Sequence, residues 1–87
     1  MTLPTIHRNG TSADTLLSYA MQAVDVLDAA RGALLAMSPN LRDFLPQREL
    51  DCVKANEEWR GHYEAVLAAI DFARAHAEHA ANGAPHA

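Results

Sequence analysis

The chain is 87 residues long, has a mass of 9.4 kDa and carries a formal net charge of −4, so it is long enough for one small domain. Apolar residues make up 49% of it and aromatic residues 6%, and alanine outnumbers valine and isoleucine. This composition favours helices over a β-sheet. The excess of 11 acidic over 7 basic residues disfavours nucleic-acid binding, because such proteins neutralise phosphates with a basic surface.

Residues 1–10 contain a proline and an Asn9-Gly10 turn signal, and we expect them to form an extended arm. They lack the basic start and hydrophobic stretch of a secretory signal, and no apolar run reaches the length of about 18 residues that a membrane span needs. Cys52 is the only cysteine, so one chain can form neither an internal disulfide nor a thiolate zinc cluster. These features predict a cytoplasmic protein without a membrane partner.

A first helix is predicted over residues 12–37, at the start of a helical region that spans 11–82. In the pattern Thr11-Ser12-Ala13-Asp14, the Thr11 hydroxyl and the Asp14 carboxylate have the spacing of a capping box. Apolar residues then recur at steps of four and three, at Leu16, Ala20, Ala23, Leu27, Ala30, Leu34 and Met37. Tyr19, Val26 and Ala33 widen this face, which predicts contact with more than one neighbouring helix.

A connection is predicted over residues 38–46 and a second helix over 47–81. Pro39 ends the first helix, and Pro46 suits the first turn of the second. A regular apolar seam runs along the second helix at Cys52, Asn56, Trp59, Tyr63, Val66, Ile70, Ala73, Ala77 and Ala80. Asn82-Gly83 ends this helix, and residues 83–87 are expected to form a flexible tail.

The predicted fold is all-α. Because the connection is short, the two long helices should form an antiparallel hairpin. Two helices cannot cover each other's apolar faces on all sides, and an alanine-rich core buries little surface. We therefore expect a homo-oligomeric helix bundle, most simply a four-helix dimer. The residues expected at the oligomer interface are Leu16, Tyr19, Ala23, Leu27, Leu34, Asn56, Trp59, Tyr63, Val66 and Ile70.

The chain shows no nucleophile elbow, phosphate-binding loop or metalloprotease helix, so we expect no enzymatic activity, no cofactor and no catalytic residue. His76 and His79 lie three residues apart on one helix face. That spacing suits a metal site shared with another chain. We interpret them instead as solvated histidines at the negative end of the helix, and expect no metal site.

Polar residues cluster at the two helix starts, where free backbone amides and the positive end of the helix dipole favour an anion. The candidate ligand-binding residues are Arg8, Asn9, Thr11, Asn40, Arg42 and Phe44. An antiparallel partner would bring the arm of one chain beside the connection of another, so such a pocket would be shared between subunits. Ordinary turn chemistry, with Arg42 and Asp43 paired at the surface, explains the same residues.

The pattern Asn9-Gly10-Thr11-Ser12, a long alanine-rich helix, then Pro39-Asn40-Leu41-Arg42-Asp43-Phe44 and Pro46-Gln47 resembles short uncharacterised proteins encoded by phages and prophages of proteobacteria. The resemblance implies an accessory protein without an assigned reaction. Small phage accessory proteins often counter host defence, either by blocking a protein or by sequestering a nucleotide second messenger.

We therefore expect a non-enzymatic interaction protein, a phage accessory protein that binds a host protein through its acidic surface or a bundle end. One alternative is an oligomeric sponge that binds a small anionic ligand, such as a cyclic nucleotide immune signal, in pockets between subunits. A further alternative is a purely structural oligomer subunit.

Overall fold

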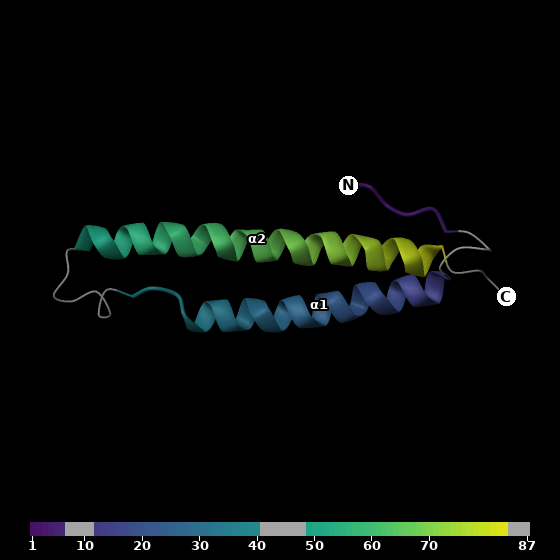
Figure 1. The fold of residues 1–87 in the computed structure, drawn as a ribbon, viewed down its shortest axis with the longest axis horizontal. Coiled ribbons are helices and arrows are strands. Elements are labelled where there is room, and N and C mark those ends of the chain that lie inside the picture. The colour runs from purple at the N-terminus through teal and green to yellow at the C-terminus, as the bar shows by residue number, and fades with distance from the viewer. Residues whose placement is uncertain (7–11, 41–48, 84–87) are drawn as a thin grey trace.

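The computed structural model describes residues 1–6, 12–40 and 49–83, and within these it contains two helices and no strand. Helix α1 spans Ala13–Ala36 and helix α2 spans Glu49–Asn82. They lie side by side and antiparallel (Figure 1). The predicted all-α hairpin is confirmed. The ends of α1 and the C-terminal end of α2 lie within one residue of those predicted, and the predicted start at 47 lies outside the described residues.

Helix α1 is capped by Ser12 and not by Thr11, so the sequence-based prediction of the cap was wrong by one residue. The backbone of Ser12 is extended, and its hydroxyl accepts a hydrogen bond from the Thr15 amide at 3.1 Å and donates one to the Thr15 hydroxyl at 2.9 Å. Both serine and threonine can cap a helix, so the sequence alone did not choose between them. Thr11 lies outside the described residues, and Asp14 lies in the first turn, where the dipole favours a carboxylate.

The seam predicted along α2 is confirmed, because every one of its nine residues is buried or half-buried. Ile70 and Ala73 are 3% and 5% exposed. On α1 the seam differs from the prediction after Leu27: Ala30 is exposed and Arg31 is half-buried in its place, and Met37 is 67% exposed. Arg31 can occupy this position because its aliphatic stem covers apolar surface while its charged head stays in water.

A hydrogen bond between the helices fixes how far one is shifted along the other. The indole Nε1 of Trp59 donates to the backbone oxygen of Leu34 at 2.8 Å. The Trp59 ring also stacks on Tyr63, with 4.9 Å between ring centroids and 14° between planes. Leu34 lies in the last turn of α1, and its carbonyl accepts from the Met37 amide at 3.2 Å as well as from the indole.

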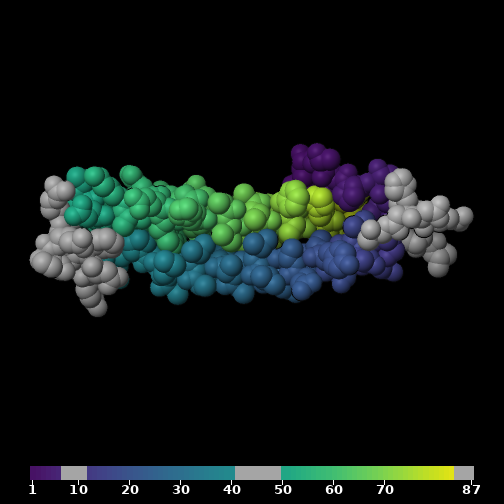
Figure 2. All heavy atoms as spheres, viewed as in Figure 1, coloured from purple at the N-terminus to yellow at the C-terminus, as the bar shows by residue number. Residues whose placement is uncertain are grey.

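The hairpin is a thin rod with extents of 64 × 20 × 15 Å (Figure 2). Its radius of gyration is 18.8 Å, whereas a compact domain of this length has one of about 12 Å. The buried apolar residues among those described are four alanines and one isoleucine, namely Ala13, Ile70, Ala73, Ala77 and Ala80. The single seam therefore forms a narrow core and leaves both side faces of the hairpin open.

Residues 1–6 have no regular secondary structure, as expected for the arm, and they lie along the C-terminal half of α2 (Figure 1). His79 Nε2 lies 2.6 Å from the backbone oxygen of Pro4, so the ring nitrogen donates to that carbonyl. The side chain of Ile6 packs directly over Gly83, where a Cβ would lie 2.8 Å from Ile6 Cγ1. The first residues of the chain are thus held on the end of α2 by one hydrogen bond and one close packing contact.

Candidate functional site

The ligand-binding residues predicted from the sequence fall almost entirely outside the described part of the chain. Arg8, Asn9, Thr11, Arg42 and Phe44 all lie in the segments 7–11 and 41–48. The structure places Asn40 alone among the six predicted residues, on the exposed stretch after α1. The clustering of the other five remains a prediction.

Asn40 lines a shallow pocket of about 390 Å³ between the end of α1 and the first turns of α2. The polar groups that share it are Asn56, Glu57 and Arg60, all on α2. The amides of Asn40 and Asn56 and the guanidinium of Arg60 supply donors, whereas Glu57 opposes an anion. Sequence reasoning did not assign Arg60 to this site, although it lies four residues after Asn56 and so on the same face of the helix.

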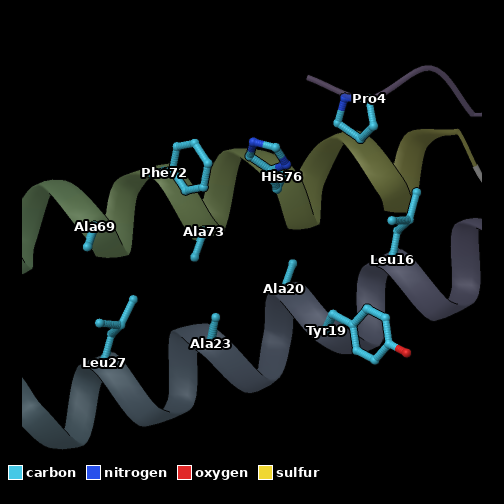
Figure 3. Close-up of a pocket in the computed structure, with 10 residues that line it drawn as sticks. All are labelled: Pro4, Leu16, Tyr19, Ala20, Ala23, Leu27, Ala69, Phe72, Ala73 and His76. Atoms are coloured by element: carbon cyan, nitrogen blue, oxygen red, sulfur yellow. The ribbon is translucent and has the colours of Figure 1, made fainter. Parts of the chain in front are cut away.

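An apolar groove of about 420 Å³ lies between the N-terminal half of α1 and the C-terminal half of α2 (Figure 3). Tyr19 and Leu27 line it from α1, Phe72 and His76 line it from α2, and Pro4 of the arm lines it as well. Its floor consists of alanines. Apart from the His76 ring and the Tyr19 hydroxyl its wall is hydrocarbon, so it suits apolar side chains and not a charged ligand.

Around this groove, helical periodicity places six uncharged residues on the same side of the two helices, and we call this set the apolar face. It is made of Tyr19, Val26 and Ala30 on α1 and Ala65, Ala69 and Phe72 on α2. Tyr19 is 65% exposed, Val26 62% and Phe72 52%. The steps of three, four and seven residues keep each set on one side of its helix. Large apolar side chains on a continuous exposed stripe indicate a surface that another molecule covers.

The opposite side of the hairpin, which we call the charged face, carries Asp28, Arg31, Tyr63, Leu67, Asp71 and Arg74 around a hollow of about 290 Å³. The side chains of Leu27 and Ile70 point into the seam between the helices. The residue before and the residue after each of them point about 100° to either side of it. Val26 and Ala69 therefore fall on the apolar face, and Asp28 and Asp71 fall on the charged face. The two faces lie back to back across the seam.

Arg31 interacts with residues of both helices on the charged face. Its Nε donates to Asp28 Oδ1 at 3.0 Å. Hydrogen bonding to the Tyr63 hydroxyl, and then the hydrogen bond and charge of Asp28, raise the pKa of Arg31 above its ordinary value. Arg31 thus carries a fixed positive charge, held in one orientation between a residue of α1 and a residue of α2.

The histidines near the end of α2 are not the solvated pair that the sequence suggested, since both are half-buried. His79 bonds to Pro4, as described above. His76 packs its ring against Phe72 at 4.4 Å between centroids, and its Nε2 is shielded from water without a hydrogen-bond partner in the described residues. The arm and the groove account for this burial, and neither was visible in the local sequence.

The oligomer-interface residues predicted from the sequence lie mostly along the seam within one chain. Nine of the ten are half-buried or buried between α1 and α2, and Tyr19 lies outside the seam on the apolar face. Among the described residues there is no group of three or more metal-ligating side chains, and neither helix is long and apolar enough to cross a membrane.

Compared with the models of known protein families, with curated proteins and with solved structures, the chain gives no match.

Proposed function

We propose that this protein is a non-enzymatic interaction protein that works as a homo-oligomer. We propose further that its charged face binds a basic surface on a host protein. The observation that carries the proposal is the back-to-back arrangement of an uncharged face and a charged face on one thin hairpin. An elongated two-helix scaffold offers surface in place of an enclosed cavity, which suits macromolecular recognition.

The distribution of charge favours a basic partner. The two helices contain ten acidic and four basic side chains, so the body of the hairpin is more acidic than the chain as a whole. On the charged face, Asp28 is paired with Arg31, and Asp71 lies in the same hollow as Arg74, so the net negative charge comes from the other acidic residues of the two helices. Complementary charge speeds the encounter and selects the partner, and it weakens as salt rises.

The charged face also has the residue types that contribute most to protein binding. Tyrosine and arginine are enriched among residues whose loss costs the most affinity. Tyr63 and Arg31 provide both types side by side, and Leu67, which is 37% exposed, provides an apolar centre. The phage origin of the chain, and hence a host protein as its target, is proposed from the resemblance of its sequence motifs.

The experiment is capture of partners from a host lysate by three tagged proteins, the natural sequence, Asp71→Lys and the control Asp25→Lys. Asp25 is exposed on α1 away from both faces, so its reversal makes the same change of net charge elsewhere. We expect one partner to be retained by the natural protein and by the control, to be lost with Asp71→Lys, and to elute with moderate salt. Capture of nothing above background, or capture equally strong with Asp71→Lys, would refute the proposal.

The pocket at Asn40 favours a second candidate, the sponge for a small anionic ligand, because Asn40, Asn56 and Arg60 present donors around one hollow. Native mass spectrometry of gently purified protein tests it directly. An added mass of a nucleotide that disappears with Arg60→Ala would support the sponge. A clean oligomer without added mass and without a captured protein would leave the purely structural subunit.

A further inference from the structure

We propose that the apolar face is covered by the apolar face of a second copy of this chain, so that two hairpins form a four-helix bundle with both charged faces outward. This inference rests on the proposed homo-oligomer and adds the surface through which it forms. The face consists of Tyr19, Val26 and Ala30 of α1 and Ala65, Ala69 and Phe72 of α2.

The accessible surface of the chain is large enough to include an interface with a second copy. Its accessible surface is 6562 Å². A compact monomer of 9.4 kDa exposes about 5,000 Å², so the chain as a whole exposes about 1,500 Å² more than a compact chain of its mass does. A stable dimer of standard size takes about 800 Å² from each partner. The excess is large enough to supply such an interface and still leave the charged face free.

The chemistry of the apolar face selects a second copy over an unrelated charged partner. None of its six residues carries a charge, although the two helices together are strongly acidic. Two copies can therefore meet on this side without bringing like charges together. On the charged face, two copies would have to remove four charged side chains of each chain from water, namely Asp28, Arg31, Asp71 and Arg74, which costs desolvation energy.

The shape of the face fits helix packing. Ala69 lies toward its middle and Ala30 and Ala65 lie at the end away from Tyr19, and small side chains let two helices approach closely. Tyr19 and Phe72 lie beside the groove near its end, where each hairpin offers a hollow of about 420 Å³. In a two-fold interface the same patch serves both partners. An aromatic side chain of each copy can therefore pack into the apolar groove of the other.

Each helix also has the second apolar stripe that a four-helix bundle requires. In such a bundle a helix contacts two neighbours, so two stripes must be apolar. Leu27 and Ile70 belong to the seam within the chain, and Val26 and Ala69, their sequence neighbours, belong to the stripe that is still open. A helix that served a lone hairpin would have no need of the second stripe.

The test compares Val26→Glu on the apolar face with Met21→Glu as its matched control. Both residues are exposed on α1, 62% and 47%, and both changes add one charge. Light scattering coupled to size-exclusion chromatography measures the mass over a range of concentrations. We expect a dimer for the natural protein and for the control, and a dimer weakened on the order of 100-fold for Val26→Glu, because each interface would bury two charges.

Hydroxyl-radical footprinting of the natural protein gives a second measurement that does not depend on the folding of a variant. We expect Tyr19 and Phe72 to become less reactive as the concentration rises, while Met21 keeps its reactivity. A monomer at every concentration would overturn both the proposed oligomer and this interface. An oligomer that protects Met21 and leaves Tyr19 and Phe72 reactive would overturn the interface alone, and neither result depends on capture of a host protein.

Discussion

Replacing Trp59 with phenylalanine tests the account of how α1 and α2 are held in register. The change removes the indole donor that meets the Leu34 carbonyl at 2.8 Å. That carbonyl keeps the hydrogen bond from the Met37 amide at 3.2 Å, so no acceptor is left without a partner and the cost is limited to one net hydrogen bond, about 1 kcal/mol. The smaller ring also buries less apolar surface against its neighbours, which costs about 1 kcal/mol more.

The free energy of unfolding should therefore fall by about 2 kcal/mol, which lowers the melting temperature of a domain this small by about 8 to 16 °C. Far-UV circular dichroism in a thermal or urea titration measures it, at one protein concentration for all variants. Met21→Leu is the control, because Met21 is 47% exposed and lies outside the apolar face, so this variant should melt with the natural protein. A Trp59→Phe protein that melts at the same temperature as the control would refute the reasoning.

Changes at three further positions test other contacts. His76→Phe should raise the free energy of unfolding by about 1 kcal/mol in a urea titration, because it removes a shielded nitrogen that has no partner in the described residues; a loss of stability would contradict this. Gly83→Ala should push Ile6 aside, since the new Cβ would lie 2.8 Å from its Cγ1, and the amides of residues 1–6 should then exchange hydrogen faster; unchanged exchange would show that the arm is held by other contacts. Arg31→Met keeps the stem over the seam, so its urea midpoint should stay near that of the natural protein, whereas Arg31→Asp should lower it by placing a second carboxylate beside Asp28.

Much of the hairpin is determined by the sequence itself. The regular steps of four and three along α2 predicted its seam residue by residue, because a helix repeats its faces with a fixed period. Pro39 predicted the end of α1 for a local reason, since proline cannot continue a helix. The two apolar stripes of α1, with Tyr19 and Val26 beside the first, were also visible, and they predicted that a lone hairpin would leave apolar surface uncovered.

The tertiary structure decided the details that depend on residues far apart in the chain. The sequence placed Ala30 in the seam, but the pairing of α1 with α2 put Arg31 there, beside Tyr63. His79 was assigned to solvent, yet it bonds to Pro4, a residue 75 positions earlier in the chain.

The same distinction applies to the two faces of the hairpin. Val26 and Asp28 flank Leu27 on α1, and Ala69 and Asp71 flank Ile70 on α2. The sequence contains both pairs of neighbours. Only the antiparallel packing of the helices places the two apolar neighbours on one side of the seam and the two acidic ones on the other, because helical periodicity determines the faces of each helix and not how two helices are turned toward each other.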